Sequence, residues 1–250
     1  MPPEVSGSPA NRPVAFVTGA AGGIGKAVVS RLRQRGVRVY ATDVALAAIP
    51  CTESDFAAAS LDVTDEAAVR AAVAACIQQF GRLDHVVHLA GKGGVGPLTE
   101  VQLAEWRELL AINLDSAFLM AKYTAAALTA SRGTLTLMAS TNALNGGSAL
   151  SGPAYAVAKA GIINLTRYLA KEWAPHRIRV NCLAPGPIDT PMVGRFDAAT
   201  RAKLIESVPL KRLGLAQEVA AAVDFLTSDG AGYMTGTVMP VDGGYTSGWG

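Results

Sequence analysis

Short apolar runs alternate with longer stretches in which apolar residues recur at helical spacing. The short runs predict strands at 14–17, 37–42, 57–61, 83–89, 134–139, 179–184 and 236–241. The longer stretches predict helices at 26–35, 65–80, 101–111, 113–130, 155–173, 198–207 and 217–227. Strands that alternate with helices are typical of a doubly wound, Rossmann-type α/β fold, so we expect a sheet covered by helices on both faces.

Composition places this sheet in a single domain. The chain has 250 residues, of which 50% are hydrophobic, and we expect one domain over 13–250. Residues 1–12 are rich in Pro, Ser and Gly and predict a disordered tail, since they lack the basic and apolar regions of a signal peptide. No apolar run is long enough to span a bilayer.

Charge and cysteine content narrow the classes of partner. The net charge is only +2 and the basic residues are dispersed, so we expect a small-molecule substrate and neither nucleic acid nor a membrane surface. Cys51, Cys76 and Cys182 lie far apart, and no metal-ligand spacing occurs, so we expect no metal. Reduced thiols of this kind suit a cytoplasmic protein.

A glycine-rich turn follows the first strand. Thr18-Gly-Ala-Ala-Gly-Gly-Ile-Gly25 lies between the strand at 14–17 and the helix at 26–35. In this order the glycines let the backbone approach a pyrophosphate, and the helix N-terminus offers free N–H groups. A flexible turn is the alternative, but the strand and helix on either side favour dinucleotide binding.

Two other strand ends point to the same ligand. Asp43 ends the second strand, where a carboxylate can accept hydrogen bonds from both hydroxyls of an adenosine ribose. A turn aspartate is the alternative. The strand at 83–89 runs into Ala90 and Gly91, which should face the same crevice because ligands gather at the carboxyl ends of parallel strands.

A tyrosine and a lysine provide candidate acid/base chemistry. Tyr155 and Lys159 are four residues apart in the stretch 155–173, so they share one face of the predicted helix. A nearby ammonium favours the phenolate, and we expect Lys159 to lower the pKa of Tyr155 towards the working range. A buried tyrosine beside a lysine that reaches solvent is the alternative for this pair alone.

Two further polar residues are candidates for the same site. Ser140 follows the strand at 134–139 and would face the crevice, although a serine there can also begin a turn. Asn113 lies among apolar residues, where it can bind a ligand or satisfy backbone groups at a helix bend.

The order of these motifs resembles the short-chain dehydrogenase/reductase family, in the branch whose members are single domains of this length. The resemblance extends from Val14 to Tyr245, with Thr18 to Gly25 matching the glycine motif and Tyr155-x-x-x-Lys159 the active-site motif. It implies a seven-stranded, mostly parallel sheet with helices on both faces. It also implies an enzyme that binds NAD or NADP and exchanges hydride between nicotinamide and an alcohol or carbonyl.

The resemblance also implies roles for individual residues. Tyr155 would be the acid/base, Lys159 would hold the nicotinamide ribose, Ser140 would bond the substrate oxygen, and Asn113 would hold a water that links Lys159 to solvent. Thr190 and Ile188 would contact the carboxamide, and Asp62 and Val63 would border the adenine. The expected cofactor-binding residues are Gly19, Gly23, Ile24, Gly25, Asp43, Asp62, Val63, Ala90, Gly91, Tyr155, Lys159, Pro185, Gly186, Ile188 and Thr190.

Two departures from the family pattern affect the expectation. The fourth strand ends in Leu89-Ala90-Gly91 where the family has Asn-Ala-Gly, so any support from an asparagine side chain must come from elsewhere. The interval between Ser140 and Tyr155 is longer than usual, but counting from Gly133 favours Ser140 over Thr141.

Substrate and assembly are less defined by the sequence. We expect NAD because Asp43 would repel the 2′-phosphate of NADP; an NADPH-dependent 3-oxoacyl-type reductase and an inactive nucleotide sensor are the alternatives. We expect a substrate lid at about 190–212, with Lys92 and Arg195 as the nearby cations. A solvated loop arginine is the favoured interpretation of Arg195, and a substrate that bears a carboxylate is the alternative. Apolar stripes at 121–128 and 160–169 suit a homotetramer, unless they face the sheet.

Overall fold

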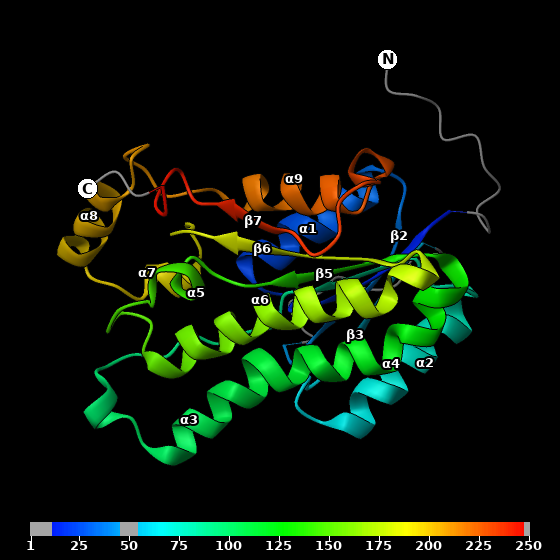
Figure 1. The fold of residues 1–250 in the computed structure, drawn as a ribbon, viewed down its shortest axis with the longest axis horizontal. Coiled ribbons are helices and arrows are strands. Elements are labelled where there is room, and N and C mark those ends of the chain that lie inside the picture. Colours follow the sequence, from blue (N-terminus) through cyan, green and yellow to red (C-terminus); the bar gives the residue numbers. More distant parts are fainter. Residues whose placement is uncertain (1–11, 46–54, 248–250) are drawn as a thin grey trace.

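The computed structural model describes residues 12–45 and 55–247 (Figure 1). The tail expected at 1–12 therefore lies outside the described residues apart from Arg12, as does most of the connection between the second and third strands. Of the three cysteines, Cys76 and Cys182 are buried and free, and Cys51 lies outside the described residues.

Seven strands form one sheet, and every strand pairing among the described residues is parallel. The order across the sheet is β3-β2-β1-β4-β5-β6-β7. The strands are β1 (Val14–Thr18), β2 (Arg38–Asp43), β3 (Phe56–Ser60), β4 (His85–His88), β5 (Thr134–Met138), β6 (Arg179–Pro185) and β7 (Val238–Val241). The chain changes direction across the sheet between β1 and β4, which is where doubly wound folds bind ligands. The predicted fold class is confirmed.

Helices cover both faces of the sheet (Figure 1). One face carries α1 (Gly23–Gln34) and α9 (Ala216–Leu226). The other carries α2 (Glu66–Phe80), α4 (Ser116–Ser131) and α6 (Pro153–Trp173), with α3 (Leu103–Leu110) leading into α4. The short helices α5 (Asn142–Asn145) and α7 (Pro191–Gly194) and the longer α8 (Ala198–Ser207) lie towards the carboxyl ends of the strands.

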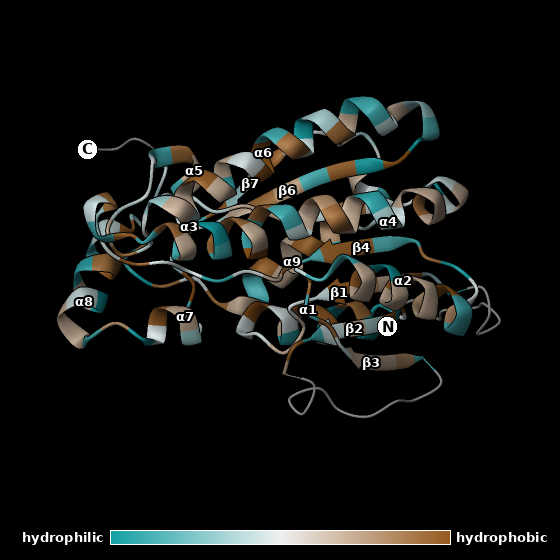
Figure 2. Cartoon of the chain, turned by 90° about the horizontal axis from the view of Figure 1, so that it is seen from below, coloured by the Kyte–Doolittle hydropathy of each residue, from teal (hydrophilic) through white to brown (hydrophobic). Residues whose placement is uncertain are grey.

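Successive side chains of each strand point to opposite faces of the sheet, and this forms two hydrophobic cores. In β1, Val14 and Phe16 enter the core beneath α2, α4 and α6, whereas Ala15 and Val17 enter the core beneath α1 and α9. All four are fully buried, as expected for a strand covered on both faces. Figure 2 shows brown hydrophobic segments along strands such as β4 and β6, and brown segments that alternate with teal ones along the helices. These cores fix the sheet and therefore the edge at which its carboxyl ends meet.

The helices predicted at 101–111 and 113–130 form one continuous helical rod. A π-helical turn at Ala111–Asp115 joins α3 to α4 and is absent from the sequence prediction. Such turns insert an extra residue and often occur at functional sites. Here the turn buries the side chain of Asn113.

The apolar stripes expected to meet a partner mostly face the sheet instead. Ala121, Leu128 and Ile162 are buried in the core. The expectation that these stripes meet a partner subunit is therefore wrong. Other apolar side chains on α4 and α6 are exposed: Phe118 is 52% exposed and Tyr168 is 63% exposed.

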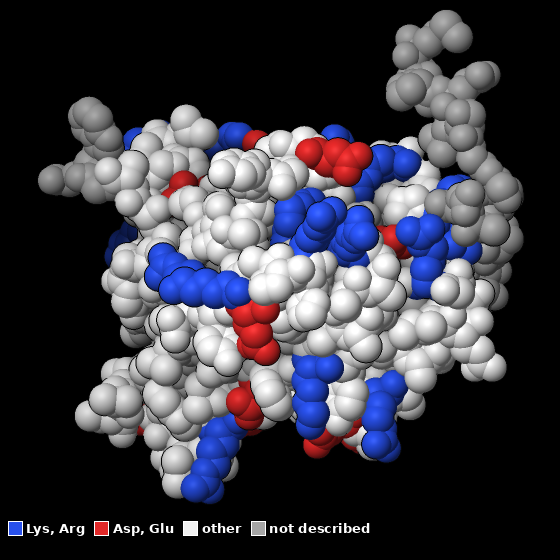
Figure 3. All heavy atoms as spheres, turned by 45° about the vertical axis from the view of Figure 1, so that its right-hand side comes forward, with Lys and Arg blue, Asp and Glu red and all other residues white. Residues whose placement is uncertain are grey.

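Charged side chains are spread over the surface. On the face shown in Figure 3, basic side chains stand in small groups, several of them beside acidic side chains, among larger uncharged areas. Within 12–45 and 55–247, none of the helices combines the length and the apolar character needed to cross a membrane.

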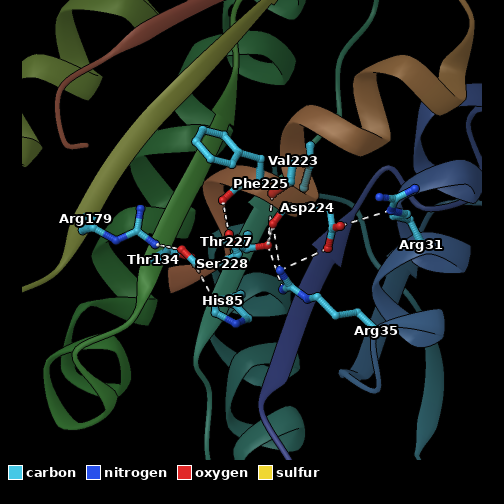
Figure 4. Close-up of polar contacts among 10 residues, drawn as sticks. All are labelled: Arg31, Arg35, His85, Thr134, Arg179, Val223, Asp224, Phe225, Thr227 and Ser228. Atoms are coloured by element: carbon cyan, nitrogen blue, oxygen red, sulfur yellow. Dashed lines mark hydrogen bonds and ion pairs between the residues drawn. The ribbon is translucent and has the colours of Figure 1, made fainter. Parts of the chain in front are cut away.

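A polar cluster joins α1 to α9 near the amino ends of the strands (Figure 4). Asp224 on α9 accepts a hydrogen bond from Arg31 Nε at 3.1 Å and forms an ion pair with Arg35 Nη1 at 3.0 Å. Arg35 also donates to the carbonyl of Asp224 at 2.7 Å and to Thr227 Oγ1 at 2.9 Å. Because the strands begin here, the cluster lies at the end of the sheet opposite the carboxyl ends.

We expect Asp224→Ala to lower the free energy of unfolding by about 2 kcal/mol, because two arginines lose a partly buried acceptor. Urea denaturation measures this loss, with the exposed Glu172→Ala on α6 as the control. The KM for the cofactor should not change, because the cluster is remote from the carboxyl ends of the strands. An unchanged unfolding midpoint would show that the cluster contributes nothing to stability.

Candidate functional site

A cavity of about 580 Å³ lies at the carboxyl ends of the strands. This volume is within the usual range for a small-molecule site. Every residue that the sequence resemblance implies for cofactor binding lines it, and so does Ser140. Asn113 is the one expected site residue that does not line the cavity.

The glycine turn brings the backbone of β1 against the end of β4. Gly19 has a φ of 66°, and a β-carbon there would lie 2.7 Å from the backbone nitrogen of Ala90, so only glycine fits. The helix α1 begins at Gly23, has no acidic residue in its first turn and directs its N-terminus to the cavity. These features suit a phosphate group, since free N–H groups and the helix dipole both favour an anion.

Asp43 lines the same cavity from the end of β2. Its carboxylate accepts hydrogen bonds from the N–H of Ala21 at 3.1 Å and of Ala45 at 3.0 Å, so it also fixes the glycine turn. Arg38 begins β2, at the opposite end from Asp43, and donates to the Arg12 carbonyl. Lys26 is exposed and does not line the cavity. Neither cation therefore neutralises the carboxylate.

Ser140 and Tyr155 meet in the cavity beside the end of β5. The Ser140 hydroxyl and the Tyr155 phenol both line the cavity, and Ser140 acts to lower the pKa of the phenol. The Ser140 hydroxyl also accepts a hydrogen bond from the N–H of Asn142 at 3.2 Å. Thr141 is buried outside the cavity lining, and its N–H donates to the Pro185 carbonyl at 3.0 Å. Ser140 is therefore the hydroxyl that lies beside the phenol.

Lys159 lies one helical turn from Tyr155, with its Nζ 5.5 Å from the centre of the tyrosine ring. Its ammonium donates to the Met138 carbonyl at 2.8 Å, and burial lowers the pKa of Lys159 to about 8. Burial also raises the pKa of Tyr155, while the hydrogen bond from Ser140 and the charge of Arg195 act in the opposite direction. The pKa of Tyr155 is therefore raised in this structure, against the expectation that it is lowered, because desolvation of the phenol is the largest effect.

Asn113 holds the backbone at the end of β4. Its Oδ1 accepts a hydrogen bond from the N–H of Lys92 at 3.2 Å, and its Nδ2 donates to the carbonyls of Lys92 at 2.8 Å and Leu109 at 3.0 Å. A β-carbon on Gly91 would lie 2.8 Å from Asn113 Oδ1 and 3.3 Å from Lys159 Nζ, so the three residues meet closely. The side chain thus positions the turn beside Lys159, and its link to a water remains a prediction.

The buried His88 supports the end of β4, next to the position (Leu89) where the family has an asparagine. His88 Nδ1 lies 2.8 Å from Thr18 Oγ1, and His88 Nε2 lies 2.9 Å from Ser116 Oγ. Ser116 donates to the Ile112 carbonyl at 2.6 Å, so its oxygen accepts from Nε2–H, and Nδ1 accepts from the Thr18 hydroxyl. The chain of bonds connects the glycine turn to the π-helical turn.

The same chain reaches the backbone that follows β4. Thr18 Oγ1 accepts hydrogen bonds from the N–H groups of Leu89 at 3.1 Å and Ala90 at 3.3 Å. Burial, followed by the charge of Lys159, lowers the pKa of His88 to about 3, so the ring is neutral near pH 7. Sequence reasoning missed His88, although a histidine inside an apolar strand was a usable signal.

We expect His88→Leu to lower the free energy of unfolding by about 2 kcal/mol, because it leaves the buried hydroxyls of Thr18 and Ser116 without this partner. Denaturant unfolding tests the expectation, with His176→Leu at an exposed position as the matched control. Equal unfolding midpoints for the two variants would contradict it.

Two loops meet beside the start of α6, the helix that carries Tyr155, and the segment after Thr190 lies on the same side of the site. The loops are joined by hydrogen bonds from Gly94 N to Ser151 O at 3.2 Å and from Gly96 N to Ala149 O at 2.8 Å. Residues 190–193 line the cavity, as expected for the start of a lid. Lys92 forms an ion pair with Glu108 at 2.6 Å. Of the two nearby cations, Arg195 is therefore the candidate contact for the substrate.

Comparison with known proteins agrees with this geometry. A family model described as "Enoyl-(Acyl carrier protein) reductase" matches residues 19–246. The chain belongs to the short-chain dehydrogenase/reductase family. Among curated members, it is 38% identical to "Cis-4-hydroxycyclohexanecarboxylate dehydrogenase" of Sinomonas cyclohexanicum, over 94% of this chain and 96% of the relative.

Other members of the family are similarly close. The chain is 37% identical to "Cyclohexanol dehydrogenase" of an Acinetobacter strain, over 95% of this chain and 96% of that protein. It is also 37% identical to "3-oxoacyl-[acyl-carrier-protein] reductase FabG" of Escherichia coli, over 92% of this chain and 96% of that protein. The crystal structure of levodione reductase superimposes with a TM-score of 0.87 at 32% identity, covering 95% of this chain and 98% of that one. As a member of this family, the protein is an oxidoreductase that acts on alcohols or ketones.

Proposed function

We propose that this protein is an NAD-dependent dehydrogenase that oxidises a secondary alcohol on a carbon ring to the ketone. The observation that carries the proposal is the meeting of Ser140, Tyr155 and Lys159 in a cavity that Asp43 also lines. The first three residues suit alcohol chemistry, and Asp43 suits a ribose without a 2′-phosphate.

The residues divide the work according to their positions. When bound, the nicotinamide ring supplies the acceptor for the hydride of the carbinol carbon. The phenolate form of Tyr155 takes the hydroxyl proton as the hydride leaves the carbinol carbon, and Ser140 donates a hydrogen bond to the substrate oxygen. Lys159 holds the nicotinamide ribose, and Asn113 fixes the turn beside it through the backbone of Lys92. The glycines of the turn after β1 leave room for the pyrophosphate.

The choice of a ring alcohol rests on two relatives. The names of the relatives from Sinomonas and Acinetobacter specify alcohols of a cyclohexane ring, and both match nearly the whole chain. The second candidate is an NADPH-dependent reductase of 3-oxoacyl groups, which the match to the Escherichia coli protein favours. Asp43 argues against this candidate, since its carboxylate would repel a 2′-phosphate.

Spectroscopic measurement of nicotinamide reduction tests the proposal. Purified protein is incubated with NAD and, separately, cyclohexanol, 4-hydroxycyclohexanecarboxylate and linear secondary alcohols, and the reverse reaction is followed with ring ketones and a 3-oxoacyl thioester. We expect turnover of the ring substrates with NAD(H). Turnover confined to the thioester with NADPH would replace the proposal with the second candidate, and cofactor binding without any turnover would indicate the nucleotide sensor.

We further propose a cytoplasmic homotetramer. The exposed Phe118 on α4 and Tyr168 on α6 support an interface on these helices, as exposed aromatic side chains commonly meet a partner. Light scattering that gives the mass of a monomer at micromolar concentration would contradict the assembly.

A further inference from the structure

Arg195 follows α7 and lies where three segments of the substrate side meet. Its Nη2 donates to the carbonyls of Gly94 and Leu150, both at 3.0 Å. These carbonyls belong to the two loops that are joined by hydrogen bonds beside the start of α6. Arg195 is exposed, as a solvated loop residue would be, but these bonds also fix its guanidinium between the two loops, two residues beyond Val193 in the cavity lining.

The charge of Arg195 has no acidic partner among the residues that the structure describes. By contrast, Lys92 is paired with Glu108 and Arg201 with Asp189. Both hydrogen bonds of Arg195 use one nitrogen and go to neutral carbonyls, so the donors on Nε and Nη1 remain for another acceptor. The guanidinium is thus a cation held in place with unused donors.

The position of this cation relates it to the reacting group. Burial raises the pKa of Tyr155, and the positive charge of Arg195 opposes that rise, so the field of the guanidinium reaches the phenol. The guanidinium carbon lies 5.0 Å from the centre of the Phe196 ring, which further limits its movement. Leu150, to which Arg195 donates, lies just before α6, which carries Tyr155. Val193, two residues before Arg195, lines the cavity. A substrate whose hydroxyl lies at Ser140 and Tyr155 would therefore extend towards Arg195.

We propose that Arg195 binds a carboxylate on the substrate, and that the preferred substrate is a ring alcohol or ketone with a carboxylate substituent. Both N–H groups of Nη1 are free to donate to carboxylate oxygens, and such charge-assisted bonds are stronger than bonds to neutral acceptors. This inference rests on the proposed dehydrogenase function and adds the class of substrate. Binding would also bring the charged end of the substrate to the lid, which Arg195 already joins to both loops.

The test compares kcat/KM for 4-hydroxycyclohexanecarboxylate with kcat/KM for cyclohexanol, in the unaltered protein and in Arg195→Met. Loss of the bonds to Gly94 and Leu150 affects both substrates, so the ratio is the informative quantity. We expect the ratio to favour the carboxylate in the unaltered protein and to fall by ~30-fold in the variant, mainly through KM. Arg201→Met removes a charge from α8 and serves as the matched control, with an unchanged ratio.

A binding measurement separates this inference from the proposed function. Calorimetry with cyclohexanecarboxylate, which has no hydroxyl to oxidise, should detect binding to the unaltered protein with NADH and at least ~10-fold weaker binding to Arg195→Met. If neither alcohol is oxidised, the dehydrogenase proposal fails, and this binding result still decides the role of Arg195. Equal effects of Arg195→Met on both substrates, or equal binding of the carboxylate, would overturn the inference and leave Arg195 as a structural link.

Discussion

Tyr155→Phe is expected to lower kcat by at least ~10²-fold and to leave NAD(H) binding nearly unchanged. The phenol lines the cavity together with Ser140 and lies one turn from Lys159, so it is the group placed to exchange a proton with the substrate oxygen. Phenylalanine keeps the ring and the packing of α6 but has no proton to exchange. Steady-state kinetics with a ring alcohol measures kcat, and cofactor titration measures binding.

The exposed Tyr168→Phe on the same helix is the matched control for this variant. Its kcat should equal that of the unaltered protein. Retention of more than a tenth of the normal kcat by Tyr155→Phe would remove Tyr155 from the role of acid/base.

We expect the protein to prefer NAD(H) over NADP(H) by at least ~30-fold in kcat/KM. A 2′-phosphate carries roughly −1.5 to −2 charges, and it would lie close to the Asp43 carboxylate. Unit charges ~4 Å apart repel by about 4 kcal/mol at an effective dielectric constant near ~20, and screening by solvent reduces this to about 2–3 kcal/mol. That range corresponds to about 30- to 150-fold.

The positions of the cations strengthen this prediction. Arg38 lies at the other end of β2, Lys26 is outside the cavity, and the residues at 46–54 include no Lys or Arg in the sequence. A 2′-phosphate would therefore face Asp43 without a compensating positive charge from these positions.

Asp43→Asn isolates the effect of charge. It keeps a side-chain oxygen for the N–H groups of Ala21 and Ala45, whereas Asp43→Ala also loosens the glycine turn. The ratio of kcat/KM with NAD to kcat/KM with NADP should fall in both variants. The kcat/KM with NAD should fall less in Asp43→Asn than in Asp43→Ala. An equal or higher kcat/KM with NADPH in the unaltered protein would contradict the prediction and favour the 3-oxoacyl reductase.

The sequence predicted the order of strands and helices because their signals are local. Apolar runs bounded by turns predicted the strands, and the helix at 198–207 coincides with α8. The helix predicted at 65–80 corresponds to α2, in which Asp65 is the N-terminal cap and Gly81 ends the helix. The residues of the glycine motif and the Tyr155–Lys159 pair were also readable, since each motif occupies one short stretch of chain.

Tertiary structure decided the features that depend on residues far apart in the sequence. The electrostatic balance at Tyr155 is one of these, because the desolvation that raises its pKa comes from the packing of several elements around the phenol. The spacing of Tyr155 and Lys159 in the sequence showed only that an ammonium group would lie near the phenol. The joining of α3 to α4 by a π-helical turn is another, since burial of Asn113 against the end of β4 stabilises it.

The sequence alone therefore determined the fold class, the cofactor-binding turn and the pair of residues suited to acid/base chemistry. Only the tertiary structure showed that His88 links the glycine turn to the π-helical turn and that Arg195 is held between the loops at Gly94 and Leu150. The physical reason is the same for both residues. Their hydrogen-bond partners lie on other elements, so the partners become neighbours only after the sheet, the loops and the lid have packed together.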